Sequence, residues 1–303
     1  MPSPVRARSV TDLAVVTDGI VGLRAATLRA MSATSDWLEI GDRVFVRRYA
    51  FYDQNIGVIL GDASALVVDT RISHRQAEET IADIRVLTPL PVRVVVNTHG
   101  HSDHAFGNRS FRPAEIWGHE RCVTMIETTG DRQRKAVAEA IPELAAELAD
   151  VVLDPPDRTF AASATVEIEP GGRSVELTYL GRGHTDNDIV VRVPDADVLF
   201  AGDLLEADAT PFFGDGFPID WPVTVEALIE LATGVVVPGH GSIGDRGFAV
   251  RQMTEFRAIA ELARLVHRGV IGIDSAVLRT PYPADTALEP LTRALAQLRG
   301  ELD

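Results

Sequence analysis

The stretch "NTHGHSDHAFGN", residues 97–108, directly follows the apolar run "VRVVV" and carries a dense group of metal-binding residue types: His99, His101, Asp103 and His104. Clustered imidazoles repel one another once protonated and lose solvation when buried, whereas a divalent metal ion binds the neutral rings directly. In an extended segment His99 and His101 share a face, so they can bind one ion together. If a helix begins near Ser102, Asp103 and His104 offer ligands to a second ion close by.

Three distant segments add single residues of the same types. "GRGHTDND" places His184 in a glycine-flanked turn, "FAGDLL" places Asp203 at a strand end, and "VPGHG" places His240 at another strand end. Each of these alone is commonplace. Together with the first cluster, they favour a metal site over a surface loop with chance histidines.

Composition and charge restrict the class of protein. The chain has 303 residues, of which 46% are hydrophobic and 24% charged, as is ordinary for a soluble globular enzyme. Its net charge of −15 disfavours nucleic acid and anionic membranes as partners. The single cysteine, Cys122, excludes an intrachain disulfide, and we find no signal peptide or transmembrane pattern. We therefore expect a cytoplasmic protein with a small-molecule substrate, and leave open whether it forms a homo-oligomer.

Patterning divides the chain into three parts: a helical extension over residues 1–36, a domain over 37–247 and C-terminal helices over 248–303 packed on that domain. The C-terminal part carries a core-facing leucine stripe at helical spacing, formed by Leu288, Leu291, Leu295 and Leu298.

Within the domain, Ser73 is a plausible N-cap for a helix that ends at Leu87. Residues from about 131 to 152 have a helical composition, with a break or a first-turn position at Pro142.

A weak internal repeat links the two halves of the domain. "ALVVD", a helix and "VVVNTH" in the first half match "VLFAGD", a helix and "VVVPGH" in the second. Two β-rich halves covered by helices and meeting at their strand ends predict one compact four-layer sandwich.

The ordered motifs also carry a family resemblance. HxHxDH at residues 99–104, followed by a Gly-His-Thr turn, an Ala-Gly-Asp and a Gly-His-Gly, resembles the metallo-β-lactamase-fold superfamily over about residues 40 to 245. The resemblance implies an α+β fold, an αββα sandwich with its metal site at the edge between the sheets.

The resemblance also assigns the ligands. It implies that the first metal is held by His99, His101 and His184, the second by Asp103, His104 and His240, and that Asp203 bridges the two. Asp69 matches an aspartate that orients a metal-bound histidine in similar proteins. Ligands that are all nitrogen or oxygen suit two zinc ions, and would also accept iron or manganese.

Two ions roughly 3.5–4 Å apart would share a water and lower its pKa, and the resulting hydroxide would attack a carbonyl carbon. Asp103 could shuttle the proton, which makes Asp103 and Asp69 the catalytic candidates. The bridging aspartate resembles the glyoxalase II-like and lactonase-like branches, which implies hydrolysis of a thioester, lactone or related acyl bond.

Other functions remain open at this point. A β-lactam hydrolase and a mononuclear iron oxygenase acting on a persulfide share most of these motifs. A phosphodiesterase or nuclease is disfavoured by the acidic charge. A non-catalytic binding protein is also conceivable, although the full ligand set argues against it.

Aromatic residues are dense in "DATPFFGDGFPIDWP", residues 208–222, shortly after Asp203. We expect this loop to form a substrate wall through Phe212, Phe213, Phe217 and Trp221. An equal alternative is that the rings close an edge of the core. Tyr52, in the "FYDQN" connection, could overhang the site from the other side.

Overall fold

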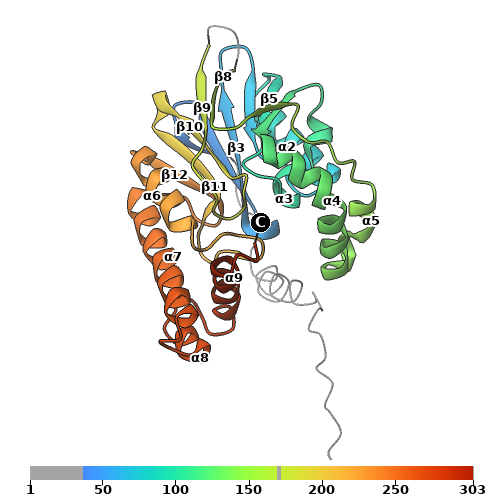
Figure 1. Ribbon diagram of the computed structural model, residues 1–303. Coiled ribbons are helices and arrows are strands. Elements are labelled where there is room, and N and C mark those ends of the chain that lie inside the picture. Colours follow the sequence, from blue (N-terminus) through green and yellow to red (C-terminus); the bar gives the residue numbers. More distant parts are fainter. Residues whose placement is uncertain (1–36, 169–171, 303) are drawn as a thin grey trace, which may run out of the picture.

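The computed structural model describes residues 37–168 and 172–302 (Figure 1). The helical extension that we predicted over residues 1–36 therefore lies outside the described residues. The remainder of the chain is an α+β structure.

The described strands belong to one sheet, which is folded into two halves. The first half holds β1 (Leu38–Gly41), β2 (Val44–Tyr49), β3 (Gln54–Leu60), β4 (Ala65–Val68), β5 (Val92–Val96), β6 (Glu115–His119) and β7 (Arg158–Phe160). The second half holds β8 (Ser163–Glu167), β9 (Ser174–Tyr179), β10 (Ile189–Val193), β11 (Val198–Glu206), β12 (Val235–His240) and β13 (Gly244–Asp245). The halves join where His240 of β12 pairs with Gln54 of β3.

Helices lie on both outer faces of the folded sheet (Figure 1). Those within the first half are α2 (His74–Leu87), α3 (Ser102–Ala105), α4 (Glu120–Ala140) and α5 (Ala145–Ala149). Those in the second half are α6 (Trp221–Leu231), α7 (Arg246–His267), α8 (Ile273–Val277) and α9 (Leu288–Leu298). Short 3₁₀ turns occupy Phe51–Asp53, Asn108–Phe111, Pro142–Leu144 and Pro194–Ala196.

Successive side chains of a strand point to opposite faces of the sheet, and apolar side chains on both faces form three apolar layers. In β11, Val198 and Phe200 face the opposite half of the sheet, whereas Leu199 and Ala201 face the helices. The central core contains residues of both halves, and the two outer cores pair one half with α2 and the other with α6 and α7. This arrangement confirms the predicted four-layer sandwich.

Local signals placed several helix ends correctly. The Ser73 side chain accepts a hydrogen bond from the backbone N–H of Gln76, so it caps α2 as expected. Pro142 follows the end of α4 and begins a 3₁₀ turn. The helix before it begins at Glu120, eleven residues earlier than the composition indicated, because the His119 side chain accepts from the Arg121 N–H at its start.

The C-terminal leucine stripe packs as predicted at its centre. Leu291 is buried with Leu262 of α7 and Ala276 of α8, and Leu298 packs at the edge of the same cluster. Leu288, by contrast, is exposed. Thus α9 is held to α7 and α8 by one apolar face.

None of the helices in residues 37–168 and 172–302 combines the length and the apolar content needed to cross a membrane.

Phe200 provides a test of the central layer. Its ring fills the space opposite Gly57, where an added Cβ would lie 2.4 Å from Phe200 Cε1. Phe200→Ala should lower the free energy of unfolding by about 3–5 kcal/mol, because the facing glycine cannot fill the cavity. Val223→Ala, on a side chain that is 67% exposed, should change it by less than about 0.5 kcal/mol. Equal denaturant midpoints for both variants would contradict this packing.

Candidate metal centre

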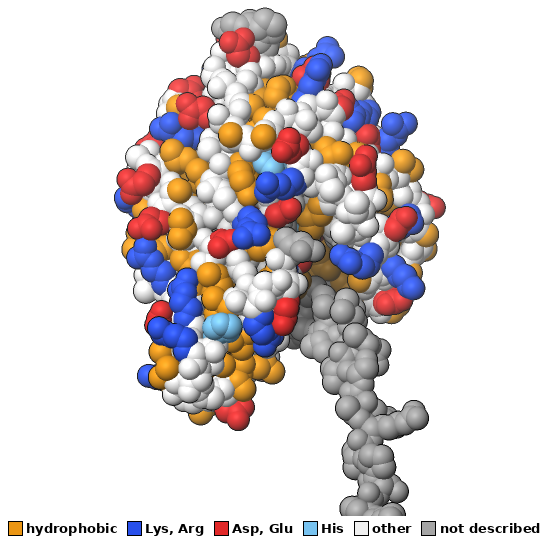
Figure 2. Space-filling view, in the orientation of Figure 1, with side chains coloured by type: hydrophobic (Ala, Val, Ile, Leu, Met, Phe, Trp, Pro, Cys, Tyr) orange, Lys and Arg blue, Asp and Glu red, His pale blue; other side chains and the backbone are white. Residues whose placement is uncertain are grey.

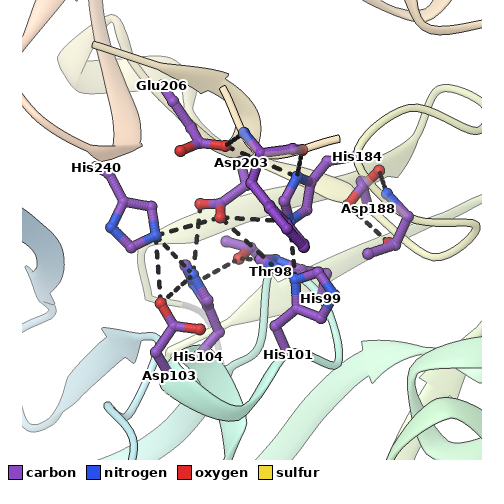
Figure 3. Close-up of polar contacts among 12 residues, drawn as sticks. Thr98, His99, His101, Asp103, His104, His184, Asp188, Asp203, Glu206 and His240 are labelled. Carbon is purple, nitrogen blue, oxygen red and sulfur yellow. Dashed lines mark hydrogen bonds and ion pairs between the residues drawn. The ribbon is translucent and has the colours of Figure 1, made fainter. Parts of the chain in front are cut away.

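The seven predicted ligands come from both half-sheets and point toward one another (Figure 3). Six of them lie at a strand end or between strands, whereas Asp203 lies within β11 and not at the strand end that the sequence had indicated. His99 and His101 follow β5, and Asp103 and His104 lie in the first turn of α3, which begins at Ser102 as predicted. His184 lies in the turn between β9 and β10. Asp203 lies within β11 and His240 ends β12. All of these side chains but His101, which is partly exposed, belong to buried residues.

A first group consists of His99, His101, His184 and Asp203, whose candidate ligand atoms lie within 4.8 Å of one another. His101 Nδ1 is 3.0 Å from His99 Nε2 and 2.8 Å from His184 Nε2. Asp203 Oδ2 is 3.4 Å from His184 Nε2. Three imidazole nitrogens and a carboxylate oxygen that converge in this way are the donor set of a divalent cation.

A second group consists of Asp103, His104 and His240, within the same 4.8 Å limit. His104 Nε2 is 3.2 Å from His240 Nε2, and Asp103 Oδ2 lies 3.3 Å from His240 Nε2. Asp203 also reaches this group, because its Oδ1 is 3.4 Å from His104 Nε2 and its Oδ2 is 3.2 Å from His240 Nε2. The Asp203 carboxylate therefore faces both groups.

The outer nitrogen of each imidazole faces an oxygen acceptor. The pairs are His99 with Thr98 Oγ1 at 3.2 Å, His101 with Asp215 at 3.0 Å, His104 with Asp69 at 2.9 Å, His184 with the Phe212 carbonyl at 3.1 Å and His240 with the Tyr52 carbonyl at 2.7 Å. When the outer nitrogen donates, the inner nitrogen presents its lone pair to the centre. Such outer contacts orient metal-binding histidines and fix their tautomers.

Asp69 occupies the position that the sequence assigned to it. It follows β4 with a φ of 65°, a left-handed conformation that aspartate tolerates. Its carboxylate accepts from the Thr98 N–H and hydroxyl, both at 2.8 Å, and contacts His104 Nδ1. The three contacts hold the carboxylate, and through it the His104 ring, in one orientation.

The Asp203 carboxylate packs very closely against β12, and one of its oxygens makes no hydrogen bond within the described part of the chain. A Cβ at Gly239 would lie 1.8 Å from Asp203 Oδ1, so only glycine permits this approach of β12 to β11. Asp203 Oδ1 is buried without a hydrogen-bond donor among the described residues. A buried carboxylate oxygen is costly without a donor or a cation. The residues present therefore fit a metal ion.

Burial and the nearby carboxylates act in opposite directions on the imidazoles of the metal-free centre. Burial lowers the pKa of His99 well below its usual value and that of His184 to about 3, so both rings are neutral. Burial also disfavours charge on His104, but the carboxylates of Asp203, Asp103 and Asp69 outweigh it and raise the His104 pKa well above its usual value. A proton on His104 therefore offsets part of the negative charge of these three carboxylates, and a bound cation would replace that proton.

Only part of the predicted substrate wall faces the metal centre in the structure. Phe213 and Trp221 are 0% exposed and Phe217 is 5% exposed, so these three rings close the core edge and present no face to a substrate. Their burial against α7 includes Phe256, whose ring centroid is 4.5 Å from that of Trp221. Tertiary packing, which the aromatic density alone does not reveal, decides between the two alternatives.

Phe212 and Tyr52 do lie at the centre. The partly buried Phe212 ring has its centroid 6.1 Å from that of His101 and 5.9 Å from that of His184. Tyr52 has a φ of 57°, which turns its carbonyl toward His240 Nδ1. Both residues therefore orient a histidine through the backbone as well as lying beside the centre.

Three contributors were not anticipated: Thr98, Glu206 and Asp215. Glu206 is buried and accepts from the Phe212 N–H at 2.9 Å, which helps to hold the residue whose carbonyl faces His184. Asp215 lies in the same loop as Phe212 and contacts His101 through both carboxylate oxygens. Its position in "FGDG" offered a signal, because a carboxylate between two glycines can approach a neighbouring group closely.

Gly239 is a direct test of the carboxylate position. Gly239→Ala should weaken zinc binding at least about 10-fold, because the added methyl group displaces the Asp203 carboxylate from both groups. Gly272→Ala is the matched control, since nothing lies within 4 Å of its Cβ position. Zinc affinity measured by chelator competition should change only in the first variant. An unchanged affinity in Gly239→Ala would contradict this geometry.

The raised His104 pKa predicts a pH dependence. The ring is protonated at pH 7 in the metal-free protein, and an imidazole must lose its proton to bind a metal. Zinc binding at pH 7 should therefore release protons, and affinity should fall as the pH is lowered. Calorimetry in two buffers of different ionisation enthalpy measures this release. Equal binding heats in both buffers would show that no proton leaves.

Comparison with known proteins places this geometry in a family. A metallo-β-lactamase type 2 of Bacillus cereus is 25% identical over 203 residues, which cover 65% of this chain and 71% of that protein. A linear primary-alkylsulfatase of a Pseudomonas species is 25% identical over 210 residues, covering 58% of this chain and 39% of that protein. The solved structure of a metallo-β-lactamase from Pontibacter korlensis has a TM-score of 0.60 at 22% identity, covering 73% of this chain and 98% of that one.

The sequence model of the metallo-β-lactamase superfamily matches residues 50–240, which is more than half of the chain. This range contains both ligand groups and the strands that carry them. The chain therefore belongs to the metallo-β-lactamase superfamily.

Proposed function

We propose that the protein is a dinuclear metal-dependent hydrolase that cleaves a thioester, a lactone or a related acyl bond. The observation that carries this proposal is the buried Asp203 carboxylate, which faces two adjacent ligand groups and has an oxygen without a hydrogen-bond donor. A single shared carboxylate is the expected ligand between two cations. Membership of a superfamily whose named members include hydrolases supports the reaction class.

The donor set supports zinc. It consists of imidazole nitrogens and carboxylate oxygens, with no thiolate, because Cys122 is buried in a separate cluster with Ala105 and Ile126. Iron or manganese would also accept these donors. Two bound ions would supply Lewis-acid polarisation of the scissile bond and lower the pKa of a coordinated water.

Asp103 is the residue to which we assign proton transfer. Burial raises its pKa, but His104 and His240 outweigh this effect and hold the pKa well below its usual value. The carboxylate is therefore ionised at neutral pH and can accept a proton beside both ligand groups. Asp69 acts indirectly, by holding His104 through Nδ1.

Phe212 and Tyr52 are the residues to which we assign substrate contacts. Phe212 lies beside the first group. Tyr52 reaches the second group through its carbonyl, which faces His240 Nδ1, and its ring is 4.2 Å from that of Phe51. Apolar rings near the reacting centre favour an acyl group with an apolar portion. On the face drawn in Figure 2, basic side chains alternate with acidic ones, which agrees with a small-molecule substrate and not with nucleic acid.

Two other substrate classes have specific support. β-Lactams are supported by the names of several relatives, and sulfate esters by one. The bridging position of Asp203 is the reason for placing thioesters and lactones first. A mononuclear iron oxygenase is less well supported, because it leaves no role for Asp103, His104 and His240.

A hydrolysis panel on the zinc-loaded protein tests the proposal. We expect thioesters or lactones to give the highest kcat/KM, above a chromogenic cephalosporin, a sulfate ester and a phosphodiester. Asp103→Asn should lower kcat by about 10²–10⁴-fold, because the amide cannot accept the proton. If the cephalosporin gave the highest kcat/KM, the substrate class would be β-lactams instead of thioesters or lactones. No hydrolysis of any compound by metal-loaded protein would contradict the hydrolase assignment.

A further inference from the structure

The loop between β11 and α6 orients two histidines of the first ligand group. Its Phe212 carbonyl faces His184 Nδ1 at 3.1 Å, and its Asp215 carboxylate faces His101 Nε2 at 3.0 Å. The loop has no regular secondary structure over residues 207–220, and the Asp215 side chain is 44% exposed. Segments of this kind are mobile unless other elements hold them. The contacts that hold this loop therefore affect the orientation of His184 and His101.

Helix α9 makes some of the contacts that hold it, in addition to the burial of Phe213 and Phe217 and the hydrogen bond from the Phe217 N–H to the Gly183 carbonyl. Arg293 donates from Nε to the Gly216 carbonyl and from Nη2 to the Asp215 carbonyl, each at 2.8 Å. Gln297, one turn further along the same side of the helix, accepts from the Ile219 N–H at 2.8 Å. The planar guanidinium suits two neighbouring carbonyls, because its donors are fixed in a fork.

The helix also has an apolar anchor that does not involve the side chains of Arg293 and Gln297. Leu291 and Ala294 pack against Leu262 and Ala263 of α7, on a face other than the one that carries Arg293. The superfamily match ends at residue 240, so α9 lies outside the part of the chain that defines the family. The helix lies outside the matched range and contacts a loop of the metal centre.

We propose that Arg293 is a positioning residue for the metal centre: it holds the Asp215 peptide, and Asp215 in turn orients His101. The chain of contacts runs from α9 through the Asp215 backbone and carboxylate to His101 Nε2, and leaves His101 Nδ1 directed at the first group. The inference rests on the metal assignment of the proposed function, but not on the identity of the substrate.

Metal affinity of the full chain, measured by competition with a chromophoric chelator, tests this role. Arg293→Ala should weaken binding of one zinc ion by about 10–100-fold, the range expected when the residues that orient a ligand are removed. Arg293→Lys keeps a charged donor but loses the fork, so its zinc affinity should lie between those of the wild type and Arg293→Ala. Arg299→Ala is the control, because Arg299 lies just after the same helix and pairs with Glu301. It should leave the affinity unchanged.

Two further measurements separate positioning from a general loss of structure. The visible spectrum of the cobalt-substituted protein should change in Arg293→Ala, while the unfolding midpoint of the metal-free protein stays close to that of the wild type. In the Asp215→Ala background, Arg293→Ala should cause no additional loss of affinity, because the contact through which it acts is already gone.

The results that overturn the inference are distinct from those that overturn the proposed function. Unchanged zinc affinity in Arg293→Ala, or a loss of affinity that adds fully to that of Asp215→Ala, would show that Arg293 does not act through Asp215. A wild-type protein that binds no metal would overturn the proposed function, and this inference with it. Absence of hydrolysis by a protein that binds metal would leave the positioning role standing.

Discussion

The buried Asp203 carboxylate is the contact on which the remaining geometry depends. It faces His104 and His240 on one side and His184 on the other, in a position where a Cβ on the neighbouring strand would not fit. A carboxylate there is unfavourable unless positive charge surrounds it. In the metal-free protein a proton on His104 supplies part of that positive charge. We expect bound cations to supply the rest in the active protein.

The fold delivers the ligands by joining two similar half-sheets at one edge. The pairing of His240 with Gln54 joins β12 to β3, so strand ends from both halves meet at the same place. The outer nitrogens are then held by groups from several elements, including Asp69 after β4 and the carbonyls of Tyr52 and Phe212. The contacts to the outer nitrogens are therefore distributed across the fold, and α9 adds contacts to the loop that carries Phe212 and Asp215.

Local patterns predicted the sandwich and the shared face of His99 and His101, whereas the resemblance to the metallo-β-lactamase-fold superfamily implied the full ligand set. The spacing of His99 and His101, and the helix start at Ser102, are set within a few residues. Asp215 was missed because its contact with His101 depends on the path of a long loop, which no local pattern specifies. For Phe213 and Trp221 the sequence left two environments open, a substrate wall and a core edge, for a related reason. An apolar ring suits a pocket wall and a core equally well, and contact with Phe256 decides the outcome.

Anomalous diffraction at the zinc absorption edge, from crystals of the zinc-loaded protein, tests the central assignment most directly. The account predicts two peaks per chain on either side of the Asp203 carboxylate, one beside His99, His101 and His184 and the other beside Asp103, His104 and His240. A single peak, or peaks away from Asp203, would contradict it.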